Sequence, residues 1–248
     1  MRLLRKNTDF DNVEVIAIDN NSADESLAYL KSLKWITLIE RQTDPTESAP
    51  LSHSRALDLG LSTVTTPFVI SIHTDTFIKD PNWLNCLLDP FQKNPSLAGV
   101  GSWKLESKTY LQELGIRFEQ MWKYYLFRYF NYKRYNKERL DLSARYLRSH
   151  CAIYKTEVIR SLYTSFSDGE STAGKVMHQK MVAAGYGMTF LDSAHLGRYI
   201  DHLNHATMVL NPELGSKSSS IKEGRKRIKS KLRGIDATAI LANDALDD

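Results

Sequence analysis

The chain has little cysteine and no long apolar run. Cys86 and Cys151 are its two cysteines in 248 residues, and they lie far apart in the sequence. Two isolated thiols indicate neither a disulfide framework nor a zinc cluster, and they are typical of a reducing compartment. No apolar run approaches the ~20 residues of a membrane-spanning helix, and residues 1–8 lack the apolar region of a secretory signal. These absences favour a cytoplasmic protein.

An excess of charge of one sign is also missing. The 33 Lys and Arg residues nearly balance the 29 Asp and Glu residues, which leaves a formal net charge of +4. That excess is too small to indicate a protein that follows the phosphates of a nucleic acid, so we expect no nucleic-acid partner. A hydrophobic content of 42% is typical of a globular protein, and the length suffices for one α/β domain.

Apolar runs alternate with helical patterns along the first hundred residues. We expect strands near 13–18, 36–40, 68–72 and 97–102, and helices near 23–33, 52–62 and 81–93. Strands that alternate with helices predict an α/β fold with a mainly parallel central sheet and right-handed crossovers.

Acidic residues follow two of the predicted strands. The strand near 13–18 is followed by Asp19, and the strand near 68–72 by His73, Thr74 and Asp75. Ligands bind at the carboxyl edge of an open α/β sheet. Asp75 is therefore placed to hold a divalent metal against a diphosphate, because such metals take oxygen ligands. The alternative is that Asp75 only begins a turn or caps the element that follows.

Three segments in order resemble the family-2 glycosyltransferases of the GT-A fold. Residues 19–26 (DNNSADES) are similar to the motif that follows the family's second strand, and residues 51–61 to the helix before its metal-binding strand. The segment 73–75 with Asp80, Pro81 and Trp83 resembles the family's Asp-x-Asp triplet and its Asp-Pro-x-Trp continuation.

The resemblance implies an enzyme that moves a sugar from a nucleoside-diphosphate-sugar to a glycan or lipid-linked acceptor of the cell envelope, by an inverting, metal-dependent reaction. It places four residues at the nucleotide, namely Asp19, Asn21, Arg55 and His73. It also makes Asp75 a ligand of Mn²⁺ or Mg²⁺. His73 stands where the family has the first acid of its triplet, and an imidazole favours Mn²⁺.

A second metal ligand is expected from a later histidine. The segment 200–205 (IDHLNH) resembles the family's late histidine segment, which implies that His202 or His205 lies near the metal or the diphosphate. We take His202 as the metal ligand. An ordinary surface or hydrogen-bonded role for either histidine stays open.

The catalytic base is expected on the loop before the helix near 172–184. We expect Ser171 or Thr172 to cap that helix. The family carries an acidic pair at its start, where this chain has Ala173 and Gly174. The nearest carboxylate is Glu170, with Asp168 as a second candidate. The alternative role of Glu170 is that of an exposed loop carboxylate or of a charge at the N-terminus of the helix.

The family also has a strand, and a loop that packs on the nucleotide base, before the first strand predicted here. We therefore expect residues 1–210 to form a GT-A-like domain without that strand. The rival prediction, from another class, is a non-catalytic GT-A-like protein that binds nucleotide or sugar or scaffolds glycan assembly.

Two further segments carry basic residues. Residues 110–146 interleave aromatic with basic side chains, a pattern that suits packing on the sheet, contact with an acceptor or a membrane, or stacking on nucleic acid. Residues 211–248 read as a linker followed by a basic helix near 222–233. That helix either rests peripherally on an anionic membrane or packs against its own domain.

Overall fold

The structure is a computed structural model that describes residues 1–103, 122, 145–170, 172–203, 206, 209 and 218–248. Most of the aromatic and basic segment 110–146 lies outside these residues, and so does His205. Within the described part of the chain, no helix is both long and apolar enough to cross a membrane.

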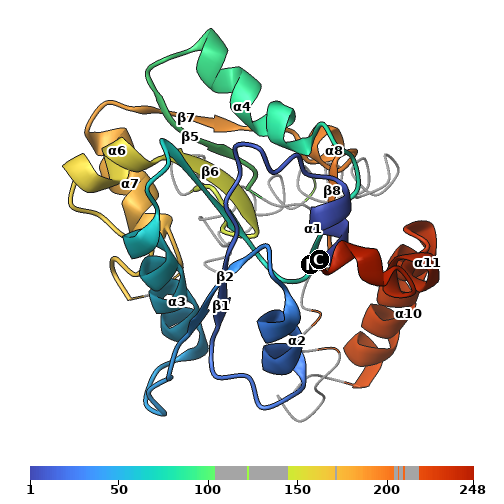
Figure 1. Ribbon diagram of the computed structural model, residues 1–248. Coiled ribbons are helices and arrows are strands. Elements are labelled where there is room, and N and C mark those ends of the chain that lie inside the picture. Colours follow the sequence, from blue (N-terminus) through green and yellow to red (C-terminus); the bar gives the residue numbers. More distant parts are fainter. Residues whose placement is uncertain (104–121, 123–144, 171, 204–205, 207–208, 210–217) are drawn as a thin grey trace.

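The centre of the fold is a four-stranded sheet with two smaller pairs of strands beside it (Figure 1). The four strands lie in the order β3 (Phe68–Ile72), β6 (Cys151–Lys155), β5 (Leu97–Gly101) and β7 (Gly187–Phe190). The first pair is parallel and joins β1 (Ile16–Asp19) to β2 (Thr37–Glu40). The second is antiparallel and joins β4 (Thr76–Ile78) to β8 (Ile200–His202).

The predicted α/β class is confirmed, but the sheet is less parallel than expected. Strand β6 runs antiparallel to both β3 and β5, while β5 and β7 are parallel. The amide of Arg148 donates to the carbonyl of Ser102 at 3.0 Å, so the chain re-enters the sheet at the end where β5 leaves it. A strand that starts at that end must run antiparallel to β5.

Helices cover both faces of this sheet, because alternate residues of each strand point to opposite faces. Cys151 and Ile153 of β6 pack toward α4 (Trp83–Lys93), together with Leu87. Ala152 and Tyr154 pack instead with Met177 and Val158 in a second apolar cluster. The helices of that side are α3 (Ala49–Thr63), α6 (Thr156–Ser161) and α7 (Lys175–Ala183).

The start of α7 differs from the prediction. Its N-cap is Gly174, with φ of 75°, and not Ser171 or Thr172. The Gly174 amide donates to the carbonyl of Phe166 at 2.9 Å, which turns the chain into the helix through a left-handed conformation. Glycine adopts that conformation without the steric cost that a side chain brings.

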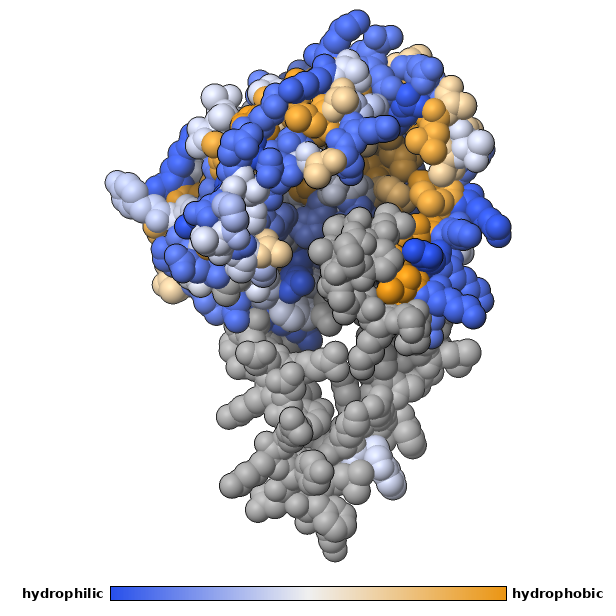
Figure 2. Space-filling view, turned by 90° about the horizontal axis from the view of Figure 1, so that it is seen from below, coloured by the Kyte–Doolittle hydropathy of each residue, from blue (hydrophilic) through white to orange (hydrophobic). Residues whose placement is uncertain are grey.

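Short helices complete the chain. They are α1 (Arg2–Lys6), α2 (Ser26–Ser32), α8 (Ser193–Leu196) and α11 (Ala237–Leu241), with a 3₁₀ turn at Asp244–Leu246. Arg2 pairs with Asp244 and Asp247, which brings the two termini together (Figure 1). Seen from below, the described surface is mostly hydrophilic, with an apolar area toward one side (Figure 2).

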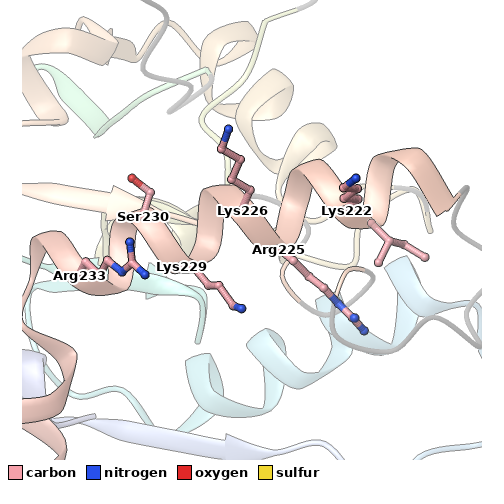
Figure 3. A pocket seen from close by; sticks show the side chains of 7 residues that line it. Lys222, Arg225, Lys226, Lys229, Ser230 and Arg233 are labelled. Carbon is pink, nitrogen blue, oxygen red and sulfur yellow. The ribbon is translucent and has the colours of Figure 1, made fainter.

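The predicted basic helix is α10 (Ser218–Gly234). It packs on the domain through Ile228, which is buried in a cluster with Leu203, Ala206 and Val209. Several basic side chains project from other parts of the helix around a surface hollow (Figure 3).

Candidate metal and nucleotide site

The candidate metal site forms where β3 turns into β4. The turn of His73, Thr74 and Asp75 is closed by the Thr76 amide, which donates to the His73 carbonyl at 3.0 Å. Strand β8 pairs with β4 so that His202 lies opposite Thr76. The Leu203 amide also donates to the Asp75 carbonyl at 3.0 Å. Backbone pairing thus holds His202 beside Asp75, across more than a hundred residues of sequence.

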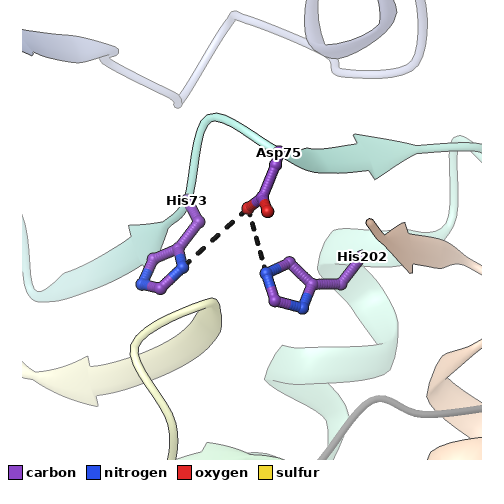
Figure 4. A group of neighbouring side chains, drawn as sticks. All are labelled: His73, Asp75 and His202. Atoms are coloured by element: carbon purple, nitrogen blue, oxygen red, sulfur yellow. Dashed lines mark ion pairs between the residues drawn. The ribbon is translucent and has the colours of Figure 1, made fainter. Parts of the chain in front are cut away.

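Three predicted residues meet here, and their ligand atoms all lie within 4.8 Å of one another (Figure 4). His202 Nε2 lies 3.0 Å from Asp75 Oδ1, and His73 Nδ1 lies 3.9 Å from the same oxygen. The three side chains are 12–30% exposed, so a ligand can reach them. One carboxylate and two imidazoles make a donor set that suits Mn²⁺ better than Mg²⁺, which prefers oxygen ligands.

Other polar side chains hold the two imidazoles in place. Ser149 Oγ lies 3.0 Å from His73 Nε2, which leaves His73 Nδ1 turned toward Asp75. The ring of His150 stacks on that of His202, with centroids 4.9 Å apart, and its Nε2 lies 3.0 Å from Ser102 Oγ. The ring of His53 meets that of His73 edge-on at 4.7 Å. Contacts of this kind fix the orientation of metal ligands.

Burial lowers the pKa of three histidines around the metal residues. It lowers the pKa of His73 to about 3 and that of His150 to about 3, and nearby imidazoles act in the same direction. Burial also lowers the pKa of His53. Burial by itself raises the pKa of Asp75, but the hydrogen bond and charge of His202 outweigh it, so the net shift is downward. At neutral pH His73 therefore offers a lone pair and Asp75 a negative charge.

Sequence reasoning did not identify His53, Ser149 or His150 as neighbours of the metal residues. His53 lies in the quoted helix motif, and the other two directly precede β6. Ser149 and His150 reach the site because β6 lies beside β3, and the His73 amide donates to the His150 carbonyl at 3.2 Å. No local pattern indicates that pairing.

Asp19 ends β1 with its side chain buried at 4% exposure. Its Oδ2 accepts a hydrogen bond from the Ser22 amide at 3.2 Å. Its Oδ1 is buried and makes no hydrogen bond within the described residues. A buried carboxylate oxygen without a donor is unfavourable, so this atom is a binding position for a ligand N–H or O–H.

The next nucleotide candidates lie around the same turn. Asn21 adopts a left-handed conformation, with φ of 62°, and its Nδ2 donates to Thr43 Oγ1 at 3.2 Å. Arg55 projects from α3 with 46% of its side chain exposed and pairs with Glu47 at 2.7 Å. Asn21 and Arg55 therefore already have protein partners, whereas Asp19 has one free oxygen.

The two base candidates differ in their surroundings. Asp168 is engaged by Lys180 Nζ at 2.7 Å, by Thr164 and by the Ser165 amide at 3.2 Å. Burial raises the pKa of Asp168, but the hydrogen bonds from Lys180 and Thr164 outweigh it and lower the pKa. Glu170 is exposed, with φ of 50°, and its charge acts on Arg55.

A family model matches the part of the chain that contains these motifs. The sequence profile described as glycosyl transferase family 2 matches residues 2–163. A search of curated proteins found no match. Among solved structures, the chain is similar to mannosyltransferase PcManGT from Pyrobaculum calidifontis in complex with GDP-Man and Mn²⁺ (TM-score 0.47, 16% identity, 74% of this chain and 46% of that one).

It is also similar to glucosyl-3-phosphoglycerate synthase from Mycobacterium tuberculosis in complex with phosphoglyceric acid (TM-score 0.45, 17% identity, 90% of this chain and 69% of that one). The chain thus spans less than half the length of the mannosyltransferase. The profile match covers most of the sequence and includes the turn after β1 and the His73–Asp75 turn. The chain therefore belongs to glycosyl transferase family 2, with the GT-A fold that its motifs predict.

Proposed function

We propose that the protein moves a sugar from a nucleoside-diphosphate-sugar to a glycan or lipid-linked acceptor, with inversion at the anomeric carbon. The observation that carries the proposal is the meeting of His73, Asp75 and His202 within 4.8 Å, at the carboxyl end of β3. Family membership supports the transferase chemistry.

The donor set is suited to a divalent metal, Mn²⁺ before Mg²⁺. When bound, such an ion neutralises charge on the diphosphate leaving group. Asp75 supplies the negative charge that attracts the ion, and the low pKa of His73 keeps that imidazole unprotonated at neutral pH. Ser149 orients His73 through its second ring nitrogen.

Asp19 binds the nucleotide of the donor in this proposal. Its Oδ1, which has no hydrogen-bond donor in the part of the chain that the structure describes, accepts a hydrogen bond from the base or the ribose of the donor. Asn21 on the same turn and Arg55 on α3 are the further nucleotide candidates, and each is held by a neighbouring side chain. The buried position makes the bond to Asp19 stronger than an exposed one, because water competes less.

Glu170 deprotonates the acceptor hydroxyl as it attacks the anomeric carbon. Of the two carboxylates on the loop, Asp168 is occupied by Lys180, Thr164 and Ser165, and its pKa is lowered, which weakens it as a base. Among the described residues Glu170 has no such set of donors, and it lies in the exposed part of the loop.

A second candidate function is supported by one observation. Ala173 and Gly174 stand where the family has an acidic pair, and Gly174 is the N-cap of α7. A protein that has lost its base can still bind nucleotide or sugar, so a non-catalytic binding protein is the alternative.

Calorimetry tests whether the binding of a nucleoside diphosphate depends on the metal. We expect nucleoside diphosphates to bind more tightly with Mn²⁺ than without it, and Asp75→Asn to remove that difference. Asp89→Asn, an exposed acid on α4, is the matched control and keeps it. Equal binding with and without Mn²⁺ contradicts the metal assignment. Donor-dependent turnover then decides between enzyme and binding protein.

A further inference from the structure

The helix α10 carries a row of exposed cations along one side. Lys222, Arg225, Lys226, Lys229 and Arg233 are exposed. Their spacing of three and four residues places them on one side of a helix. Within the described residues none of the five makes an ion pair or a hydrogen bond. We call these five residues the basic stripe (Figure 3).

The opposite side of α10 is fixed to the domain. Ile228 is buried, and a Cβ at Gly224 would lie 2.5 Å from Val209 Cγ2. Lys231 pairs with Asp201 and also donates to the His202 carbonyl at 3.0 Å. Arg227 donates to the Leu203 carbonyl at 3.1 Å. Lys231 and Arg227 thus attach the helix to the domain, whereas the basic stripe makes no such contact within the described residues.

The excess of positive charge on α10 destabilises the helix. The helix holds seven basic residues and a single acidic one, Glu223. Like charges three or four residues apart repel each other and destabilise a helix. An anionic partner relieves this repulsion, and a partner as long as the helix relieves it for all five cations.

We propose that the basic stripe docks the protein on an anionic membrane surface. A straight helix of 17 residues is about 25 Å long, and its stripe can lie flat on a layer of anionic headgroups. Clusters of Lys and Arg bind such lipids. Single-stranded RNA is the weaker candidate, because α10 has no aromatic residue on which bases could stack.

The attachment of α10 links this surface to the candidate metal site. Lys231 and Arg227 hold the backbone of residues 201–203, and His202 belongs to the metal site. A docked α10 therefore keeps that site close to the membrane, where a lipid-linked acceptor would be presented. The role of the acceptor rests on the proposed function, whereas the docking does not.

Sedimentation with vesicles tests the docking, with the full chain and without donor or metal. We expect binding to vesicles that contain phosphatidylglycerol and none to phosphatidylcholine alone. Each basic residue contributes about fivefold in affinity. The triple variant Lys222→Gln, Lys226→Gln, Lys229→Gln should therefore bind about 100-fold more weakly. Glutamine keeps the helical propensity.

A control variant removes the same charge elsewhere. It carries Lys31→Gln, Lys34→Gln and Lys93→Gln, all at exposed positions outside α10. We expect its binding to stay within about threefold of the wild type, since these cations lie outside the stripe. Thermal unfolding checks that both variants fold. Should the stripe variant unfold, a salt titration of the wild type decides, because electrostatic docking must weaken with salt.

Three results would overturn the proposal. The first is equal binding to neutral and anionic vesicles. The second is an equal loss of vesicle affinity in the stripe and control variants. The third is release of the protein from anionic vesicles by single-stranded RNA that carries the same total charge as the lipid. The last result assigns the stripe to nucleic acid. Since donor and metal are absent from the assay, failure here leaves the proposed function standing.

Discussion

Changing Asp19 to asparagine separates a ligand-binding role from a structural one. The substitution keeps the size of the side chain, and the asparagine oxygen can still accept the hydrogen bond from the Ser22 amide. It removes the charge from the buried Oδ1 that lacks a partner. An unsatisfied buried polar atom costs about 1–3 kcal/mol. The ligand-free Asp19→Asn protein should therefore be as stable as the wild type, or more stable.

Nucleotide affinity should move in the opposite direction. A hydrogen bond to a charged group is worth about 1.5–3 kcal/mol, which corresponds to a loss of about 10- to 100-fold in affinity. Calorimetry with nucleoside diphosphates measures the affinity, and urea unfolding without ligand measures the stability. Asp24→Asn is the control, because Asp24 is an exposed acid on the same turn that accepts from the Ser26 amide.

Two results would refute this reasoning. Unchanged nucleotide affinity in Asp19→Asn returns Asp19 to a purely structural role. A loss of stability as large as the loss of affinity shows that the charge supports the fold and not the ligand. The combination of retained stability and weakened binding is the signature of a residue that is kept for function.

Two further predictions concern the base and the buried histidines. Glu170→Gln should lower turnover about 10²–10⁴-fold and leave donor affinity nearly unchanged, whereas Asp168→Asn should affect turnover less; a retained rate in Glu170→Gln excludes that base. Because burial lowers the pKa of His150 to about 3 in the folded protein, unfolding takes up a proton below pH ~6.5. Its contribution to stability is intact above that pH and is lost as the pH falls, by about 2 kcal/mol at pH ~5. Urea unfolding with a chelator present should show that His150→Asn loses less stability than the wild type as the pH falls. An equal dependence of the free energy of unfolding on pH in both proteins contradicts the prediction.

The parts of the site that directly follow apolar strands could be predicted from the sequence. Asp19 and Asp75 follow apolar runs that do form β1 and β3, so local hydrophobic patterns sufficed to place them. His202 needed the resemblance to the family. Its position depends on β8, a strand of three residues that pairs with β4 far away in the sequence. A pairing this short has no signal of its own in the sequence.

The histidine cluster shows what local patterns leave out. His150 joins it because β6 runs antiparallel beside β3, and strand alternation had predicted a mainly parallel sheet. The direction of β6 depends on where the chain re-enters the sheet after a long segment. The predicted cap of α7 was wrong for a related reason. Serine and threonine are the usual caps, but a tertiary hydrogen bond to Phe166 selects a left-handed Gly174 instead.

The central claim is that Asp75 and two imidazoles hold a divalent metal, and pulsed electron paramagnetic resonance of Mn²⁺ tests it most directly. With a nucleoside diphosphate present, the spectrum should show nitrogen couplings from His73 and His202. His202→Ala should remove one of these couplings, while His195→Ala, outside the cluster, should keep both. A spectrum of bound Mn²⁺ without nitrogen couplings would contradict the account.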